Sequence, residues 1–242
     1  MGNYADSKER LADDARTIKK KSFLKQVYID FYKRIIPKNV LPGPIVELGS
    51  GGGFIKEINP GIITSDIIPG PGVDQVFFAE KMPFKDKSIS AFLMVDVFHH
   101  IKDPEGALKE MNRCLKVNGK ILMVEAYITF FGKLIYKHLH QENCDLASDW
   151  KVKGQGRISD SNIAMPWIIF VRDRKIFKDK FPNLKILRVF PHTPFSYLFS
   201  GGLTKFQFLP GFTYPFIKSI ENLMSPINSY FGMFATIAIQ KK

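Results

Sequence analysis

The chain contains little cysteine and no long apolar segment. Two cysteines among 242 residues cannot build a disulfide framework, and no CxxC or Cys/His spacing indicates a zinc or other metal site. No run of about 18 apolar residues occurs, so no transmembrane helix is expected. The first ten residues are polar and lack the apolar core of a secretory signal, which favours a cytoplasmic location.

Acidic side chains are scarce relative to basic ones. The chain has 35 Lys and Arg against 23 Asp and Glu, a formal net charge of +12. Residues 1–43 carry +5, residues 44–149 carry −3, and residues 150–242 carry +10. This distribution argues against a uniformly basic coat for nucleic acid. It favours a catalytic core with basic ends that either meet an anionic partner or are simply solvated.

Hydrophobic periodicity divides the chain into helices and strands. Apolar residues three and four apart predict a helix over 7–36, interrupted near Lys19–Ser22. Short apolar runs bounded by Gly and Pro predict buried strands at 45–48, 62–66, 73–78, 89–95, 120–127, 184–190 and 233–239. Further helices are predicted at 53–58, from Asp103–Pro104 to Asn118–Gly119, and at 161–181 with Ser161 as the N-cap. The alternation predicts an α/β protein with a parallel sheet covered by helices on both faces.

A glycine-rich segment follows the first predicted strand. It reads Glu47-Leu-Gly-Ser-Gly-Gly-Gly53, an E-x-G-x-G-x-G pattern whose glycines let the backbone turn sharply and approach a flat cofactor. Asp66 ends the second predicted strand, 19 residues after Glu47. A carboxylate at that place can accept both hydroxyls of a ribose. The strand, the loop and the acidic residue together indicate a cofactor that contains adenosine.

Several ordered motifs resemble those of the class I S-adenosylmethionine-dependent methyltransferases. The likeness is to their type 11 group, which includes enzymes of quinone biosynthesis. Beyond the loop, Met82–Ser88 resembles the LPF-x-D-x-S segment of the group, and Phe98–Pro104 resembles its LHH…DP segment. The R-x-L-K-P-G-G turn is imperfect here, with Val117–Lys120 in its last four places. These motifs span residues 44–127, about a third of the chain.

The resemblance implies a fold and a division of the chain. The expected fold is Rossmann-like, with a seven-stranded, mostly parallel sheet, helices on both faces, an antiparallel last strand and a substrate-capping insertion. Residues 1–43 would form an N-terminal helical segment, and residues 44–127 the half that binds S-adenosylmethionine. Residues 128–242 would form the substrate side, with lid segments at 128–160 and 191–231.

The resemblance also assigns residues to the cofactor, which becomes S-adenosylhomocysteine as the product. Asp66 would bind the ribose hydroxyls, Ile67 would lie on the adenine face, and Asp96 would face the methionine end. Glu47 would hold the loop. The remaining expected contacts are Gly49, Ser50, Gly51 and Gly53 in the loop, and Ala79, Glu80 and Met82 around the adenine edge.

One position departs from the family pattern. Many members have an Asp immediately before the residue that aligns with Ala79, where it contacts the adenine amino group. This chain has Phe78 there. We therefore expect backbone groups or Glu80 to replace that contact, or adenine to bind more weakly.

Candidate acid–base residues lie in and near the first lid segment. Methyl transfer from a sulfonium is an in-line displacement, and an oxygen or nitrogen acceptor also has to lose a proton. His140 and Glu142 occur in a polar stretch of this segment, and His100 follows the fourth predicted strand. The alternative is that the His99–His100 pair is structural and that His140 is a surface residue of a lid helix.

Three functions are compatible with these patterns. The leading hypothesis is methyl transfer to an oxygen or nitrogen of a small or lipid- or glycan-linked metabolite. An RNA methyltransferase is the second, although no NPPY-type motif follows the fourth strand, where Asp96–His99 stands. A non-catalytic binding protein with the same fold is the third.

The aromatic residues of 191–231 bear on the partner. This segment contains 10 Phe and Tyr among 41 residues, and Phe212, Phe216 and Ile220 would share one helical face. That face either packs on the protein or, helped by the basic ends, makes peripheral contact with an anionic membrane.

Overall fold

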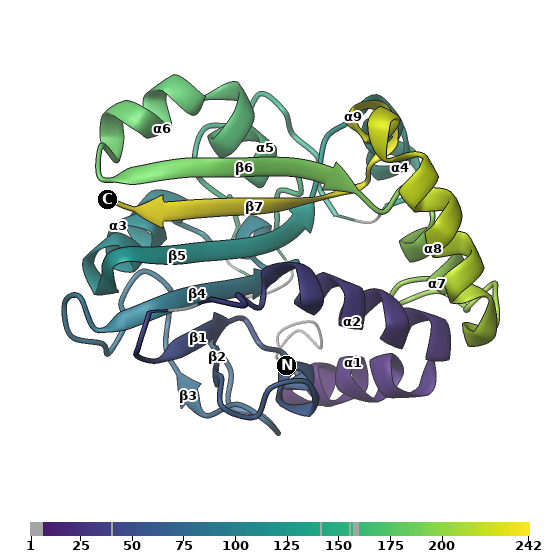
Figure 1. Cartoon of the computed structure of the whole chain (residues 1–242), viewed down its shortest axis with the longest axis horizontal. Helices are drawn as coiled ribbons and strands as arrows, with labels where there is room; N and C mark the ends of the chain where they lie inside the picture. Colours follow the sequence, from purple (N-terminus) through teal and green to yellow (C-terminus); the bar gives the residue numbers. More distant parts are fainter. Residues whose placement is uncertain (1–6, 40, 141, 155, 157–159) are drawn as a thin grey trace.

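The computed structural model describes residues 7–39, 41–140, 142–154, 156 and 160–242. Parts of the predicted 1–43 and 128–160 segments therefore lie outside the described residues. A single seven-stranded sheet with the strand order β3-β2-β1-β4-β5-β7-β6 runs through the molecule (Figure 1). Its strands are β1 (Ile45–Leu48), β2 (Ile63–Asp66), β3 (Gln75–Val76), β4 (Ile89–Val95), β5 (Leu115–Ala126), β6 (Leu184–His192) and β7 (Phe234–Lys241).

The sheet is mostly parallel. β1 pairs in parallel with β2 and with β4. The pairs β2–β3 and β4–β5 are also parallel. β7 is inserted between β5 and β6 and is antiparallel to both. The Rossmann-like sheet with an antiparallel last strand, predicted above, is confirmed. The strand order reverses between β1 and β4, which is where sheets of this kind bind ligands at their carboxyl ends.

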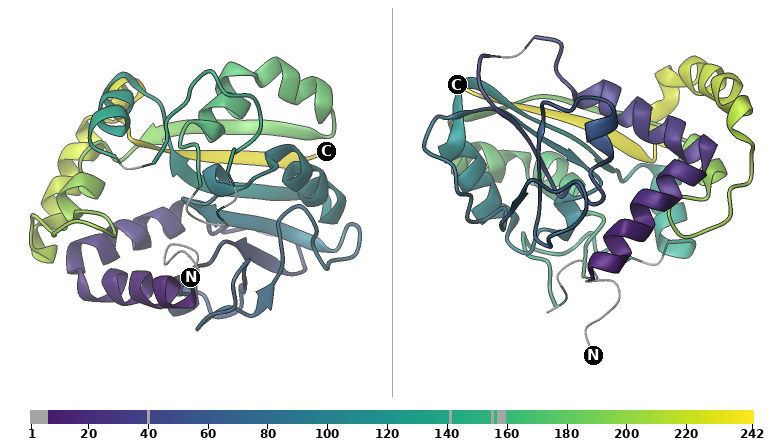
Figure 2. Two further views of the ribbon diagram at one scale, coloured as in Figure 1. Left: turned by 180° about the vertical axis from the view of Figure 1, so that it is seen from behind. Right: turned by 90° about the horizontal axis from the view of Figure 1, so that it is seen from below.

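Side chains alternate between two hydrophobic cores, one on each face of the sheet. On β4, Phe92 and Met94 belong to one core, and Leu93 and Val95 belong to the other. The first core is completed by α3 (Pro104–Cys114), α5 (Met165–Trp167), the π-helical turn η4 (Ile168–Arg172) and α6 (Arg174–Lys180). Figures 1 and 2 show these helices on the face opposite α2.

The second core is built largely from the N-terminal helices α1 (Lys8–Lys20) and α2 (Ser22–Ile35). Ser7 caps α1 by accepting a hydrogen bond from the Arg10 N–H, and Lys21 has an extended backbone that separates the two helices. The predicted break near Lys19–Ser22 is therefore confirmed. Phe23, Leu24 and Phe31 of α2 are fully buried.

The predicted helix over 161–181 is wrong in part. Residues 161–164 are not helical, α5 begins at Met165, and the helix is broken by η4 and by Asp173. Tertiary contacts explain this: the Ser161 hydroxyl donates to Glu142 Oε2 instead of capping a helix. The Asp173 carboxylate accepts the Trp150 indole N–H at 2.8 Å.

Two other boundaries also differ. The helix that was expected to reach Asn118–Gly119 ends at Cys114, because Leu115 already pairs with Ile89 of β4. The strand predicted over 73–78 is reduced to Gln75–Val76 at the edge of the sheet.

The two long segments on the substrate side carry helices at one edge of the molecule. Residues 128–160 contain α4 (Phe130–His138), and residues 191–231 contain α7 (Ser196–Ser200), α8 (Tyr214–Leu223) and α9 (Asn228–Phe231) with the 3-10 turns η5 (Gly211–Thr213) and η6 (Ser225–Ile227). Two short 3-10 turns, η2 (Phe54–Glu57) and η3 (Phe98–His100), follow β1 and β4. Within the described ranges, no helix is both long and apolar enough to cross a bilayer.

Candidate active site

The glycine loop after β1 forms one wall of a large cavity. Gly49 and Gly51 have positive φ angles of 66° and 53°, in the left-handed region that favours glycine. A Cβ on Gly49 would lie 2.4 Å from Val97 Cγ1, so no side chain fits there. A Cβ on Gly51 would meet nothing within 4 Å. The loop therefore leaves open space for a ligand to approach its backbone.

Asp66 lies at the end of β2 and connects the loop to the next segment. Its Oδ2 accepts the Gly51 N–H at 2.9 Å, and its Oδ1 accepts the Ile67 N–H at 2.8 Å. Burial raises the pKa of Asp66, and the backbone N–H donors partly offset that effect. The carboxylate lines the cavity and keeps lone pairs for further donors, such as the two hydroxyls of a ribose.

Glu47 is buried beneath the loop, outside the cavity lining. Its Oε1 accepts the Tyr32 hydroxyl at 2.7 Å, while Oε2 has no hydrogen-bond partner among the described residues. Burial raises the pKa of Glu47 to about 7, against the lowering effect of the Tyr32 hydrogen bond. The side chain thus ties α2 to β1.

The other predicted cofactor residues fall into two groups. Ser50, Ile67, Ala79 and Glu80 line the cavity together with Gly49, Gly51, Asp66 and Asp96. Gly53 and Met82 do not line it. A Cβ on Gly53 would lie 2.4 Å from the Gly72 carbonyl oxygen, and Met82 is buried in the first hydrophobic core. Phe78 also lines the cavity, and its ring is half exposed.

A cluster of charged side chains lies at the carboxyl ends of β4 and β5, and its centre is His99. The His99 ring is 1% exposed, and its Nδ1 lies 2.9 Å from Glu125 Oε2 while its Nε2 lies 3.1 Å from Glu142 Oε2. Burial alone would lower the pKa of His99, but the carboxylates of Glu142 and Glu125 outweigh it and raise the pKa well above its ordinary value. His99 is therefore a buried imidazolium.

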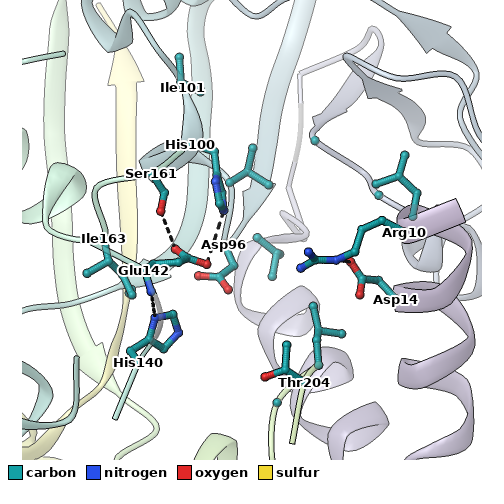
Figure 3. Close-up of a pocket in the computed structure, with 18 of the residues that line it drawn as sticks. Arg10, Asp14, Asp96, His100, Ile101, His140, Glu142, Ser161, Ile163 and Thr204 are labelled. Atoms are coloured by element: carbon teal, nitrogen blue, oxygen red, sulfur yellow. Dashed lines mark hydrogen bonds and ion pairs between the residues drawn. The ribbon is translucent and has the colours of Figure 1, made fainter. Parts of the chain in front are cut away.

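Glu142 lines the cavity and contacts the His99 ring nitrogen opposite the one that faces Glu125. Figure 3 shows its carboxylate close to Ser161 and His100. It accepts the Ser161 hydroxyl at 3.0 Å, and its Oε1 lies 3.9 Å from His100 Nε2. Burial favours the neutral acid, but the neighbouring imidazolium of His99 lowers the pKa of Glu142 well below its usual range. Glu142 therefore stays ionised and orients the histidine rings around it.

Asp96 follows β4 with a positive φ of 60°, which is uncommon for a residue with a side chain. Its carboxylate lines the cavity and lies 3.9 Å from His99 Nδ1. Burial raises the pKa of Asp96 to about 7, an effect that His99 opposes and that Glu125 and Glu142 strengthen. A carboxylate in this position is ready to pair with a cation.

His140 also lines the cavity, after the end of α4. Its Nδ1 accepts the backbone N–H of Glu142 at 3.2 Å, so the proton of the neutral ring lies on Nε2. Burial lowers the pKa of His140. In this tautomer Nε2 is the hydrogen-bond donor of the neutral ring, and Nδ1 is already occupied by the Glu142 N–H.

The sequence patterns did not predict the ion pairs of His99 with Glu125 and Glu142, and they did not predict α1 as a wall of the cavity. Arg10 and Asp14 of α1 line the cavity and form an ion pair of 3.0 Å (Figure 3). A Cβ on Gly52 would lie 2.1 Å from Ala15 Cβ, so α1 packs directly on the glycine loop. In the sequence, the four-residue spacing of Arg10 and Asp14 is compatible with an ion pair on one face of a helix. The spacing does not indicate which part of the molecule that helix packs on.

The same cluster contains atoms that metal ions prefer. Ligand atoms of His99, His100 and Glu142 all lie within 4.8 Å of one another, and those of Asp96, His99 and Glu125 do as well. Both sets include His99, whose two ring nitrogens already face carboxylates. A metal ion that binds here through His99 would have to replace a proton on its ring and break its ion pair with Glu142.

The cavity has a volume of about 1290 Å³. Single-ligand pockets usually occupy about 300–1,000 Å³, so this one has room for a cofactor and a second molecule. Its far wall is apolar, with Ile135 and Leu139 from the α4 segment and Tyr197, Leu203 and Phe208 from 191–231. Both segments predicted as lids thus contribute to the lining.

Comparison with solved structures identifies the fold. The chain resembles a SAM-dependent methyltransferase from Thermotoga maritima, described as a possible histamine N-methyltransferase, with 18% identity over 94% of both chains and a TM-score of 0.56. It also resembles a geranyl diphosphate methyltransferase (15% identity, 95% of this chain, 83% of the other, TM-score 0.51). A geranyl diphosphate C-methyltransferase from Streptomyces coelicolor A3(2) is similar as well, with 12% identity over 90% of this chain and 78% of the other, and a TM-score of 0.50. No curated protein sequence matches the chain.

Residues 70–123 match a family model described as a methyltransferase domain. With the strand order and the antiparallel β7, this match supports a class I S-adenosylmethionine-dependent methyltransferase of the type 11 group. S-adenosylmethionine is the cofactor consistent with that class. The open loop at Gly51, the buried carboxylate of Asp66 and the partly exposed carboxylate of Asp96 fit that molecule, which combines a ribose with two positive charges.

Proposed function

We propose that the enzyme transfers a methyl group to an oxygen or nitrogen of a small, partly apolar acceptor, including one linked to a lipid or glycan. The observation that carries this proposal is the shared cavity. Its lining includes the glycine loop and Asp66, the polar side chains of Asp96, His100 and Glu142, and aromatic and aliphatic side chains of the two lid segments. Groups suited to the cofactor, to proton removal and to an apolar acceptor thus line one cavity.

In this proposal the cofactor half uses residues from β1, β2 and β4. The backbone of Gly49–Gly51 approaches the cofactor, Asp66 accepts the ribose hydroxyls, and the exposed ring of Phe78 covers the adenine. The sulfonium of the cofactor supplies the activated methyl group. Asp96, a partly exposed carboxylate whose pKa is raised to about 7, gains a partner when a cationic group binds beside it.

We assign removal of the acceptor proton to His100. Its ring lines the cavity, and its Nε2 lies 3.9 Å from Glu142 Oε1. The ionised Glu142 stabilises the imidazolium that forms, and the His99 cation holds Glu142 in place. His140, as a donor through Nε2, would orient the acceptor. The chain Glu125–His99–Glu142–His100 therefore acts as one unit.

The lid role of 128–160 and 191–231 belongs to the same proposal. Leu139 and His140 come from the first segment, and Leu203 and Phe208 from the second. The Lys205 ammonium donates to the Leu139 carbonyl at 3.2 Å and so connects the two. Closing the cavity from both sides would exclude water from the transfer step.

Calorimetry with S-adenosylmethionine and a transfer assay with labelled methyl test the proposal. The acceptor panel contains phenols, amines and hydroxylated isoprenoid lipids. We expect the wild type to bind the cofactor and methylate an oxygen or nitrogen acceptor, and Asp66→Ala to bind at least tenfold more weakly. Asp149→Asn, at an exposed position, should match the wild type.

His100→Gln separates proton removal from binding. We expect it to lower the turnover number and alter its pH profile while cofactor affinity is kept. A wild type that binds no cofactor, or that methylates only carbon or sulfur, would overturn the proposal.

A further inference from the structure

Helix α8 presents its apolar residues to solvent. Phe212, at the turn before it, is 84% exposed, and Phe216 and Leu223 are 70% and 82% exposed. Ile220 lies between them, so these four share one helical face. The opposite, inward face contains the buried Tyr214 and Glu221. An amphipathic helix on a globular protein normally has the reverse arrangement.

Polar contacts of the inward face hold α8 in this orientation. Glu221 is 3% exposed, and its Oε1 accepts the backbone N–H groups of Phe195 and Ser196 at 3.0 and 2.7 Å. Lys218 bridges Glu221 at 3.3 Å and Asp30 of α2 at 2.8 Å. Turning the apolar face inward would leave these buried charges without partners, which costs several kcal/mol.

The exposed apolar surface continues into the preceding loop. Phe206 and Phe208 are 83% and 64% exposed. We call Phe206, Phe208, Phe212, Phe216, Ile220 and Leu223 the outer ridge. Figures 1 and 2 show α8 at an outer edge of the molecule in each view. An exposed apolar area of this extent marks an interaction surface.

Basic side chains flank the outer ridge. Lys21 donates to the Gly202 carbonyl at 2.7 Å, which places the Lys19–Lys21 run beside the loop that carries Phe206. Lys20 and Lys205 are exposed. Within 191–231, all of which the structure describes, Glu221 is the single acidic residue, and it is buried. Lys19 pairs with Glu57 at 2.9 Å, so the positive charge beside the ridge comes from Lys20, Lys21 and Lys205.

We propose that the outer ridge docks on an anionic lipid bilayer. Exposed Phe and Leu on one helical face insert at the boundary between headgroups and acyl chains, and the lysines beside them meet anionic headgroups. Phe208 belongs both to the ridge and to the cavity lining, so the docked face is continuous with the acceptor end of the cavity. Docking is independent of the proposed function, and it gives a lipid-borne acceptor a direct route to the site.

Vesicle co-sedimentation tests the docking. The full chain is mixed, without cofactor, with vesicles of neutral phosphatidylcholine or of phosphatidylcholine containing one quarter phosphatidylglycerol. We expect binding to the anionic vesicles that is about tenfold stronger than to the neutral ones, because the lysines beside the ridge are attracted to anionic headgroups. Phe212→Ser/Phe216→Ser should lower anionic binding at least tenfold, and Lys20→Glu by about fivefold or more.

The matched control is Val117→Ser/Leu187→Ser, which removes two exposed apolar side chains outside the ridge. It should bind vesicles like the wild type, and both double variants should keep the wild-type melting temperature and cofactor affinity.

Equal binding to neutral and anionic vesicles, or equal binding by the two double variants, would overturn the proposal. A concentration-dependent dimer abolished by Phe212→Ser/Phe216→Ser would replace the bilayer with a second copy. Loss of cofactor binding with vesicle binding retained would instead count against the proposed function alone.

Discussion

Among single residues, His99 is the cation shared by Glu125 and Glu142. Its ring nitrogens lie 2.9 and 3.1 Å from their carboxylates, and Glu125 is fully buried. His99→Gln would leave carboxylates buried without their cation, so we expect the free energy of unfolding to fall by about 3–5 kcal/mol. Urea denaturation at pH 7 measures this. The exposed His138→Gln on α4 is the control and should stay within about 0.5 kcal/mol of the wild type.

Glu47 gives stability an unusual dependence on pH. Burial raises its pKa from 4.5 to about 7 in the folded protein, so the fold favours the protonated form. Its contribution is present in full below the unfolded pKa and is lost as pH rises through about 7. Glu47→Gln, which stays neutral, should therefore gain stability relative to the wild type between pH 5 and 8.5, by about 3 kcal/mol at most. Urea unfolding of both proteins across this range measures the difference, and a constant difference would contradict the prediction.

Asp96 predicts how cofactor affinity depends on pH. With its pKa near 7, the free carboxyl must lose its proton before it pairs with a cationic cofactor. Affinity for S-adenosylmethionine should fall up to tenfold per pH unit below about 6.5 and level off above about 7.5. Calorimetry from pH 5.5 to 8.5 tests this. Asp96→Asn should bind weakly at every pH, whereas Glu47→Gln, outside the cavity lining, should keep the wild-type profile.

At the scale of elements, the contact between α1 and the glycine loop predicts a linked effect. Gly52→Ala would bring a new Cβ to 2.1 Å from Ala15 Cβ, so α1 has to move off the loop. We expect weaker cofactor binding and faster proteolytic cleavage within residues 8–20. Gly61→Ala, at an exposed turn, provides the control because its Cβ meets only Asn59 Oδ1 at 3.4 Å. Equal cleavage rates for the two variants would show that α1 does not depend on this contact.

Elements with local signals at both ends were predictable. β1 and β4 have the predicted bounds, because each is a short run of mainly apolar residues and Gly or Pro residues punctuate the chain around β1. The 161–181 region was not, because contacts with distant residues break its helical periodicity: Trp150 binds Asp173, and Glu142 binds Ser161. The residues predicted to contact the cofactor come from local motifs at or after the ends of β1 to β4, and most of them line the cavity. His99 was named only as half of a pair expected to be structural. Its ion pairs were not predictable, because Glu125 and Glu142 come from segments that only the folded sheet brings together.

At the scale of the whole molecule, the cavity joins distant parts of the chain. It is lined by Arg10 near the N-terminus, the glycine loop, and Phe234 of β7. A bound cofactor therefore stabilises the folded chain as one unit, by about 2.7 kcal/mol at a concentration of 100 times Kd. We expect a rise in Tm of roughly 5–10 °C. Thermal denaturation with and without S-adenosylmethionine measures it, and Asp66→Ala at the same cofactor concentration should show a much smaller rise.

The charge cluster at the carboxyl ends of β4 and β5 bears on product inhibition. Asp96, Glu125 and Glu142 surround the single imidazolium of His99, so negative charge exceeds positive charge there. The cofactor arrives as a sulfonium, and its product leaves as a neutral sulfide. The cluster therefore attracts the molecule that enters more strongly than the one that must depart. We therefore expect S-adenosylhomocysteine to inhibit this enzyme less strongly than it would inhibit an enzyme whose site lacks the excess negative charge. Its turnover should accordingly fall less as product accumulates.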